Sequence, residues 1–253
     1  KCQLKLTATG IPGHGSTPEE FDKIAVYKIH EIMDKLKKKK RKLYMIDEYK
    51  NTIDSLSIPG VFKFLLKRKR LIRGLLSLLS RITGDPFKKF FIPTITDTMV
   101  PTIIRAGNKV NVISPSASLS LDIRTLPGHD KDYILKRLRK IIGKDLFNQL
   151  EISPIDLTTS TSTPTNTTYY EKLGETLSEM YYNANLVPIL DVAGTDMKHA
   201  RKRTACYGFS FIMVDRGFTY DDLGGIAHAP NERVSITNLM LNTEFIYRLI
   251  KKM

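Results

Sequence analysis

The sequence contains little cysteine and no long apolar run. Its 253 residues include two cysteines, Cys2 and Cys206, which are too few for a disulfide framework, so we expect a reducing, cytoplasmic location. Lysine or arginine interrupts every apolar stretch before it is long enough to cross a bilayer, so the sequence predicts no membrane-spanning helix. No secretory signal opens the chain. Residues 1–6 already have the pattern of a strand, and we expect them to lie inside a longer protein.

Acidic residues are scarce in one part of the chain. The formal net charge is +14, and between Lys35 and Phe90 there are 17 lysines and arginines against 4 aspartates and glutamates. Nearly all of the excess charge lies in this segment, which indicates a basic insertion in an otherwise balanced protein. The hydrophobic fraction of 42% is normal for a globular core, and the length allows one large domain or two smaller ones.

Residues 3–155 have the order strand, helix, insertion, strand, strand, helix, strand. This split βαβ order is typical of a ferredoxin-like fold, with an antiparallel sheet and helices on one face. The predicted strands cover residues 3–9, 94–105, 110–113, 116–124 and 150–155, and the predicted helices cover 18–38 and 130–143. The first helix is expected to bury Phe21, Ile24, Ala25, Ile29, Ile32, Met33 and Leu36.

Two patterns in the insertion allow both a structural and a functional interpretation. Lys37 to Lys42 is a run of six cations; a solvated helix end is favoured over a nucleic-acid contact, because few aromatic residues are interleaved. Val61 to Ile82 has the pattern of one basic amphipathic helix. Such a helix can lie on an anionic membrane or pack on a neighbouring domain or subunit, and the packing interpretation is favoured.

The remaining residues predict an α/β layer that follows a hinge at Thr158 to Thr165. Predicted helices cover residues 167–182 and 236–250 and begin near 197, and predicted strands cover 187–190 and 205–211. These strands are too few for a closed sheet, so we expect the larger part of this sheet to lie in sequence outside the chain.

One histidine stands on a glycine-hinged loop. His228 follows Gly224 and Gly225 and precedes the closing helix. An imidazole on such a loop can serve as a metal ligand or general base. A lone loop histidine is more often a surface residue, so chemistry alone leaves both interpretations open.

Five short motifs, in this order, together resemble the zinc-dependent aminoacylase and carboxypeptidase family. They are Gly13-His14-Gly15-Ser16-Thr17-Pro18, Asn111-Val112-Ile113-Ser114-Pro115, Asp122-Ile123-Arg124, Gly194-Thr195-Asp196 and His228-Ala229-Pro230-Asn231-Glu232. In that family a ferredoxin-like lid or dimerisation domain interrupts a two-zinc α/β catalytic domain. The resemblance implies a lid at residues 1–156, with a helical insertion at about 42–93, followed by the C-terminal part of the catalytic domain at 157–253.

The resemblance also implies roles for residues that contact the substrate. His14 would reach the partner subunit's active site and stabilise the oxyanion, and Asn111 would lie near the substrate carboxylate or oxyanion. Arg124 would bind the substrate carboxylate, for which a planar guanidinium is well suited. The backbone of Gly194 and Thr195 would line the substrate pocket.

The resemblance makes His228 the last zinc ligand of a site that holds two zinc ions, or cobalt or manganese, in the full-length enzyme. The family's His-x-Asp motif, bridging aspartate and catalytic Glu-Glu pair are absent from the 253 residues; Glu19-Glu20 lies in the lid helix and is rejected. One histidine cannot hold a zinc ion, so the chain as given is expected to be inactive. The insertion resembles the enlarged lids of carboxypeptidase S and N-acyl-amino-acid hydrolases.

These observations support one main hypothesis and leave two others. The main hypothesis is a metal-dependent hydrolase of peptides or N-acyl amino acids that forms a homodimer through the lid. The alternative is a non-catalytic dimerisation or membrane-surface module that uses the basic insertion. Nucleic-acid binding is the least favoured.

Overall fold

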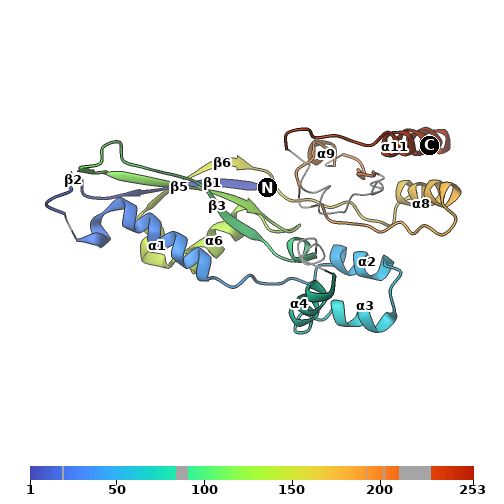
Figure 1. Cartoon of the computed structure of the whole chain (residues 1–253), viewed down its shortest axis with the longest axis horizontal. Helices are drawn as coiled ribbons and strands as arrows, with labels where there is room; N and C mark the ends of the chain where they lie inside the picture. Colours follow the sequence, from blue (N-terminus) through green and yellow to red (C-terminus); the bar gives the residue numbers. More distant parts are fainter. Residues whose placement is uncertain (19, 84–90, 192, 202, 211–228) are drawn as a thin grey trace. The chain divides into compact units, whose positions relative to one another are not determined.

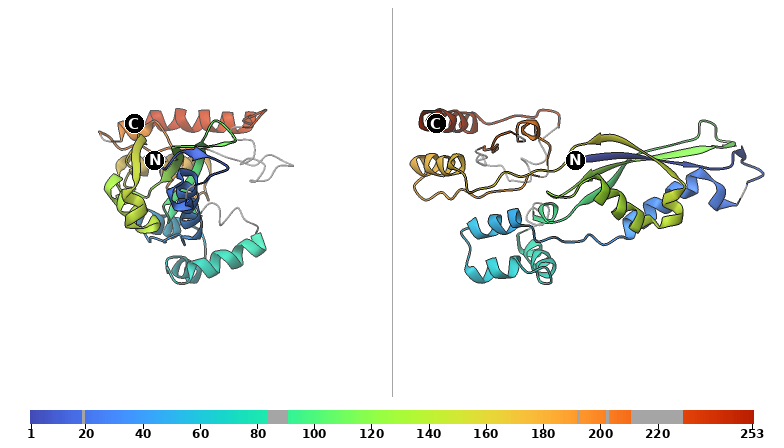
Figure 2. Two further views of the ribbon diagram at one scale, coloured as in Figure 1. Left: turned by 90° about the vertical axis from the view of Figure 1, so that its left-hand side faces the viewer. Right: turned by 180° about the vertical axis from the view of Figure 1, so that it is seen from behind.

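The computed structural model describes the chain except for residues 19, 84–90, 192, 202 and 211–228, and for residues 76 and 79–83 it describes the backbone alone. Contacts divide the chain into two compact units. The first unit comprises residues 1–43 and 96–161, and the second comprises 44–95 and 162–253. Figures 1 and 2 show the elements of both units.

The first unit contains a four-stranded antiparallel sheet with the order β3-β5-β1-β6. Its strands are β1 (Cys2–Thr9), β3 (Thr98–Ala106), β5 (Ser116–Arg124) and β6 (Leu150–Leu157). Helices α1 (Ala25–Lys38) and α6 (Lys131–Ile142) cover one face of this sheet (Figure 1). A short helix, α7 (Lys144–Asn148), follows α6 and was not predicted. The arrangement confirms the predicted ferredoxin-like order.

The alternation of buried and more exposed residues along the strands explains where the core lies. Every second residue of β1 is buried and belongs to one apolar cluster with the inner faces of α1 and α6, because successive side chains of a strand point to opposite faces. The buried residues of β1 and the two helices are Cys2, Leu4, Leu6, Ala8, Ala25, Ile29, Ile32, Ile134, Leu138 and Ile142. Hydrophobic spacing alone therefore predicts most of this core.

Helix α6 begins and ends where its flanking residues predict. The carboxylate of Asp130 accepts the backbone N–H of Tyr133 at 2.8 Å, so Asp130 caps the first turn. Gly143 follows the last turn with φ of 94°, a left-handed conformation that glycine adopts without steric cost.

The predicted helix over residues 18–38 is wrong at its start. A single 3₁₀ turn, η1 (Phe21–Lys23), precedes α1, and Ile24 between them is extended. Phe21 is 62% exposed and does not belong to the buried stripe. The carbonyl of Lys23 accepts the N–H of Ile11 at 3.0 Å, and a Cβ on Gly10 would lie 2.4 Å from the nitrogen of Ala25. Packing of the loop at residues 10–11 against residues 23–25 therefore interrupts the helix.

Among the described residues of the second unit, the regular elements are all helices. They are α2 (Asp47–Ser55), α3 (Gly60–Leu66), α4 (Ile72–Thr83), α8 (Thr168–Met180), α9 (Met197–Ala200) and α11 (Ile236–Lys252). The predicted helices after residue 165 are confirmed. The strands predicted at 187–190 and 205–211 do not form over residues 187–190 and 205–210. A strand requires a hydrogen-bonded neighbour, and the described residues supply none for these segments.

The prediction of one helix over residues 61–82 is also wrong. Helix α3 ends at Leu66, and α4 begins at Ile72. Leu66 and Ile72 are both buried, and the hydroxyl of buried Tyr49 donates to the carbonyl of Leu66 at 3.1 Å. In a continuous helix, that carbonyl would accept a hydrogen bond from the N–H of the residue four positions later. The Tyr49 contact therefore accompanies a turn rather than a continued helix, and α2, which carries Tyr49, was not predicted.

Hydrogen bonds join the insertion to the C-terminal residues within the second unit. The hydroxyl of Thr52 donates to the carbonyl of Pro188 at 2.7 Å, and the hydroxyl of Ser162 donates to Glu48 at 2.6 Å. The functional division at residues 156 and 157 stays a prediction.

Candidate functional site

A two-stranded ribbon brings His14 beside Asn111. Strand β2 (Gly13–His14) pairs with β4 (Val112–Ile113), so that His14 lies opposite Val112. The N–H of Gly15 also donates to the carbonyl of Asn111 at 2.9 Å. As a result, Nε2 of His14 and Nδ2 of Asn111 lie 3.5 Å apart, although the residues are 97 positions apart in sequence. The structure thus joins two of the predicted site residues.

One neutral tautomer of His14 fits its contact with the backbone of Ser16, and the other fits a hydrogen bond from Nδ2 of Asn111 to Nε2. Nδ1 accepts the backbone N–H of Ser16 at 3.3 Å and lies 2.7 Å from the Ser16 hydroxyl. With Nδ1 as an acceptor, the neutral imidazole carries its proton on Nε2. In this tautomer the N–H groups of His14 and Asn111 converge from exposed positions. Two donors cannot bond to each other, but they can bind one anionic oxygen between them.

Arg124 lies in the four-stranded sheet, at the end of β5 away from the His14 ribbon. Strand β5 begins near the His14 ribbon at Ser116, which pairs with Thr9. It ends at Arg124, which pairs with Thr98. Eight residue steps at about 3.3 Å each separate the two ends by about 26 Å. One small substrate therefore cannot contact Arg124 and His14 of the same chain.

The guanidinium of Arg124 is held by a neighbouring carboxylate. Its Nε lies 2.6 Å from Oδ1 of Asp122 and its Nη2 donates to Oδ2 at 3.3 Å, and Gln3 donates to Oδ2 at 3.1 Å. Burial opposes ionisation of Asp122, but the hydrogen bonds from Arg124 and Gln3 outweigh it and hold the pKa of Asp122 below its ordinary value. The ionised carboxylate orients the guanidinium, and a substrate carboxylate would approach the edge formed by Nη1 and the remaining N–H of Nη2.

Replacing Arg124 by methionine is expected to raise the pKa of Asp122, because burial then acts with less opposition. In the wild-type chain the folded pKa lies below the unfolded one, so this pair stabilises the fold above the unfolded pKa. That contribution is lost as pH falls through the folded pKa. Carbon-13 NMR titration of the Asp122 carboxyl measures the shift. Arg248→Met, which removes an exposed ion pair with Glu244 on α11, is the control. An unchanged pKa of Asp122 in Arg124→Met would contradict this account.

The other predicted site residues belong to the second unit. Gly194 and Thr195 lie on the exposed loop before α9, where the Thr195 hydroxyl accepts the N–H of Met197 at 3.4 Å. A Cβ on Gly194 would meet no atom within 4 Å, so packing among the described residues does not require glycine there. His228 lies outside the described residues.

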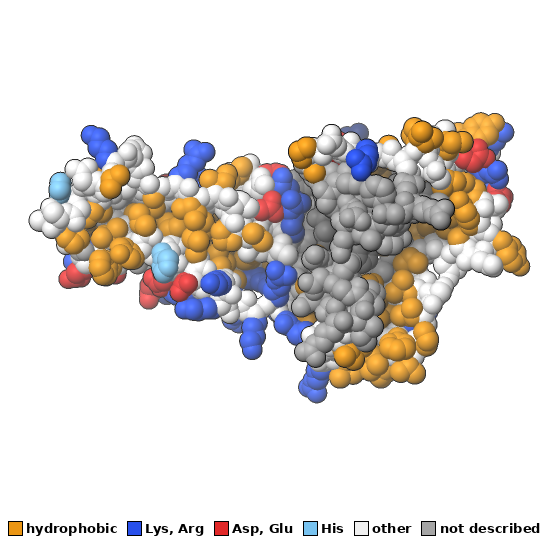
Figure 3. Space-filling view, in the orientation of Figure 1, with side chains coloured by type: hydrophobic (Ala, Val, Ile, Leu, Met, Phe, Trp, Pro, Cys, Tyr) orange, Lys and Arg blue, Asp and Glu red, His pale blue; other side chains and the backbone are white. Residues whose placement is uncertain are grey.

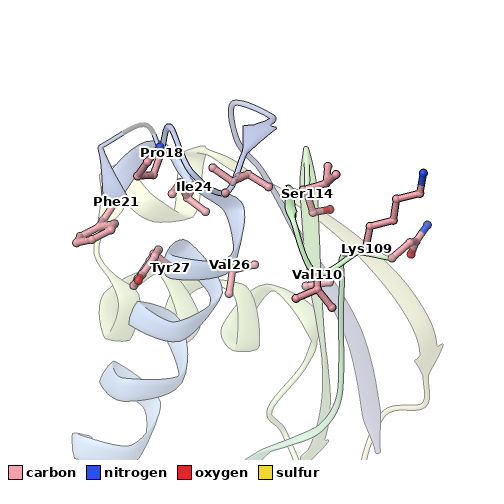
Figure 4. A pocket seen from close by; sticks show the side chains of 14 residues that line it. Pro18, Phe21, Ile24, Val26, Tyr27, Lys109, Val110 and Ser114 are labelled. Atoms are coloured by element: carbon pink, nitrogen blue, oxygen red, sulfur yellow. The ribbon is translucent and has the colours of Figure 1, made fainter.

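An open hollow of about 640 Å³ lies beside the His14 ribbon in the first unit. Phe21, Val26 and Tyr27 line one side, Lys109 and Val110 line the other (Figure 4). Gly15, next to His14, also contributes to the lining. The walls are about equally polar and apolar, and their apolar side chains suit an apolar group of a molecule bound at His14.

The sequence did not reveal a buried polar network around Asp97. Oδ1 of Asp97 lies 2.7 Å from Nδ1 of His129 and accepts the N–H of Leu126 at 3.0 Å. Oδ2 accepts the hydroxyl of Tyr133 at 2.9 Å and also pairs with Arg137. The sequence feature that could have indicated this network is the position of Asp97, a single acidic residue directly before an apolar strand. Because its carboxylate is fully buried, we interpret this network as structural.

The described residues do not form a metal site by themselves. No three histidine, cysteine, aspartate or glutamate side chains in the described ranges lie close enough together to hold an ion. Protein metal sites usually need three or more ligands, so this donor set does not fit a metal. In the same ranges, none of the helices has the length and apolarity to cross a bilayer.

Comparison with curated proteins shows similarity along nearly the whole chain. It is 26% identical over 260 residues to "Probable carboxypeptidase S-like 2" of Dictyostelium discoideum, covering 98% of this chain and 46% of that protein. It is 24% identical over 261 residues to the mouse "N-fatty-acyl-amino acid synthase/hydrolase PM20D1", covering 98% of this chain and 48% of that protein. The chain therefore spans about half the length of these relatives.

Solved structures show the same fold at low sequence identity. The Saccharomyces cerevisiae dipeptidase Dug1p matches with a TM-score of 0.59 at 12% identity over 99% of this chain and 53% of its own. The Sulfolobus solfataricus M20 family metallo-carboxypeptidase Sso-CP2 matches with a TM-score of 0.52 at 15% identity over 78% of this chain and 53% of its own. The model of the M20 peptidase dimerisation domain matches residues 1–149. The chain therefore belongs to the M20 peptidase dimerisation-domain family, which confirms the resemblance found in its motifs.

Proposed function

We propose that the full-length protein is a metal-dependent hydrolase of amide bonds in peptides or N-acyl amino acids. Residues 1–156 would form its lid and dimerisation domain, and residues 157–253 the last part of its catalytic domain. The names of the relatives, carboxypeptidase S-like and N-fatty-acyl-amino acid synthase/hydrolase, support these two substrate classes. A cytoplasmic location stays a prediction from the cysteine content.

The proximity of His14 and Asn111 is the observation that carries this proposal. Amide hydrolysis passes through a tetrahedral intermediate whose oxygen is negatively charged, and fixed N–H donors stabilise that charge. Nε2 of His14 and Nδ2 of Asn111 lie 3.5 Å apart, close enough for one oxygen to accept a hydrogen bond from each in the tautomer with the proton on Nε2. The apolar side chains of the hollow beside them would then contact part of the acyl group or side chain of the substrate.

The distance between the two ends of the sheet supports a site shared by two subunits. His14 and Asn111 would serve the active site of the partner subunit, and Arg124 would bind the substrate carboxylate at the other end of the lid. A homodimer through the lid would satisfy both contacts, because the ends lie about 26 Å apart within one chain.

The metal would need ligands from the rest of the full-length protein. His228 would supply one ligand to zinc, cobalt or manganese, and such an ion, when bound, would supply Lewis-acid chemistry. Backbone groups of Gly194 and Thr195 would line the substrate pocket. The chain as given would be inactive, because one histidine does not make a metal site.

Replacing His228 by alanine in the full-length protein is expected to lower both the bound metal and the hydrolysis of an N-acyl amino acid. Elemental analysis by mass spectrometry measures the metal independently of activity. His30→Ala, which removes an exposed histidine on α1, serves as the control and should change neither value. Unchanged metal content and rate in His228→Ala would remove this residue from the site.

A further inference from the structure

Helices α3 and α4 and the turn that joins them, residues 60–83, have an unusual composition. This helix–turn–helix segment, whose two axes cross rather than run antiparallel (Figures 1 and 2), is called the α3–α4 hairpin. Residues 55–84 contain seven lysines and arginines and no aspartate or glutamate. Four consecutive cations, Lys67 to Arg70, form the turn between the helices. The hairpin therefore combines a concentrated positive charge with the apolar residues of both helices.

The turn of the hairpin is anchored in the protein. Leu66 at the end of α3 and Ile72 at the start of α4 are both buried. The hydroxyl of Tyr49 donates to the carbonyl of Leu66, and Lys67 pairs with Asp54 on α2 at 2.7 Å. These contacts fix the turn, so that the rest of the hairpin surface has a defined orientation.

Five large apolar side chains of α3, the turn and α4 are exposed. Their exposed fractions lie between 43% and 69%. These side chains are Val61, Phe62, Phe64, Leu71 and Leu78. Figure 3 shows hydrophobic side chains gathered over the region of α3. Single exposed apolar residues are ordinary, but a group of this size marks an interaction surface.

Cations lie among these exposed apolar residues. Arg68, Lys69 and Arg70 are exposed next to Leu71, and the guanidinium of Arg68 lies 4.4 Å above the ring of Phe64. Aromatic and aliphatic side chains beside lysine and arginine are the combination that binds the interface of an anionic bilayer.

We infer that the exposed surface of the α3–α4 hairpin binds the surface of an anionic lipid bilayer. Phe62, Phe64 and Leu71 enter the boundary between headgroups and acyl chains, and the cations of the turn contact the anionic headgroups. The inference is independent of the proposed hydrolysis. It departs from the packing interpretation favoured by the sequence, because these side chains are exposed in the folded unit.

A bilayer explains the surface better than a nucleic acid does. A phosphate backbone attracts the same cations, and Phe62 or Phe64 could stack on a base. The exposed aliphatic side chains of Val61, Leu71 and Leu78 have no comparable use on a nucleic acid, whereas each gains free energy by leaving water at a lipid interface.

Flotation of the chain with lipid vesicles tests the inference. Vesicles of phosphatidylcholine with phosphatidylserine are expected to bind the chain, and vesicles of phosphatidylcholine alone should bind it far less. High salt should weaken the binding, because it screens the cations. The double variant Lys69→Glu with Arg70→Glu should lower the partition coefficient about tenfold or more. Phe62→Ser with Phe64→Ser should lower it to a similar extent.

Two matched controls separate local from general effects. Lys39→Glu with Lys40→Glu makes the same charge change at exposed residues that follow α1. Ile104→Ser with Ile155→Ser removes exposed apolar side chains from β3 and β6 of the first unit. Both should bind vesicles like the wild-type chain, and circular dichroism checks that all variants fold.

Four results would overturn the inference. The first is no binding to anionic vesicles, and the second is equal binding to phosphatidylcholine alone. The third is an equal loss in the hairpin variants and in the controls. The fourth is displacement of the chain from anionic vesicles by an RNA of equal phosphate concentration, which would assign the hairpin to nucleic acid.

Discussion

Replacing Asp97 by alanine is expected to lower the free energy of unfolding of the first unit by about 3–5 kcal/mol. Its carboxylate is fully buried, and Arg137 is only 15% exposed. Without Asp97, the guanidinium of Arg137 stays buried with less compensation, and the N–H of Leu126 loses its acceptor. Removing one member of a buried pair costs much more than breaking an exposed pair, because water does not replace the lost partner.

Urea denaturation, with hydrogen exchange at amides of β5 and α6, measures this loss within the first unit. Glu244→Ala removes an exposed partner of Arg248 on α11 and should change stability by less than about 1 kcal/mol. The double variant Asp97→Ala with Arg137→Met should lose less than the sum of the two single variants, because the unpaired charge is gone as well. If Asp97→Ala lowers the free energy of unfolding as little as Glu244→Ala does, the network around Asp97 contributes little to stability.

Replacing His14 by alanine in the full-length protein is expected to lower kcat for an N-acyl amino acid by about 10²–10³. Asn111→Ala should have an effect of the same order, because each variant removes one of two donors to the same oxygen. The metal content should stay unchanged, which distinguishes these variants from His228→Ala. His30→Ala is the control for loss of an exposed histidine.

Mixing two inactive variants tests whether the site is shared between subunits. A dimer of one His14→Ala subunit and one His228→Ala subunit would contain one complete site, in which His14 comes from the second subunit and His228 from the first. Activity should therefore reappear when the two variants are unfolded and refolded together. If the mixture stays inactive although mixed dimers form, His14 does not act across the dimer. If His14→Ala keeps the wild-type rate, the oxyanion role is wrong.

Local patterns predicted much of the first unit. The strand over residues 116–124 has the bounds of β5, and the predicted helix over 130–143 differs from α6 by one residue at each end. Alternating apolar residues define the buried face of a strand, and Asp130 and Gly143 define the helix ends, so neighbouring residues carry all the information needed.

Residues distant in sequence decided the places where the predictions failed. The helix over 18–38 is interrupted because the loop at Gly10 packs against residues 23–25. The helix predicted over 61–82 stops at Leu66, whose carbonyl accepts a hydrogen bond from the hydroxyl of Tyr49. The strands predicted at 187–190 and 205–211 have no neighbour among the described residues. In each case a periodic pattern was present, and a long-range contact or its absence outweighed it.

The candidate site shows the same division between sequence and structure. The motifs by themselves determined the family and singled out His14, Asn111 and Arg124, because they depend on residue identity and order. Only the tertiary structure decided that His14 and Asn111 meet while Arg124 lies at the far end of β5. It also decided which apolar residues of the α3–α4 hairpin are buried and which are exposed. The reason is physical: strand pairing and side-chain packing join residues whose distance along the chain carries no information about their distance in space.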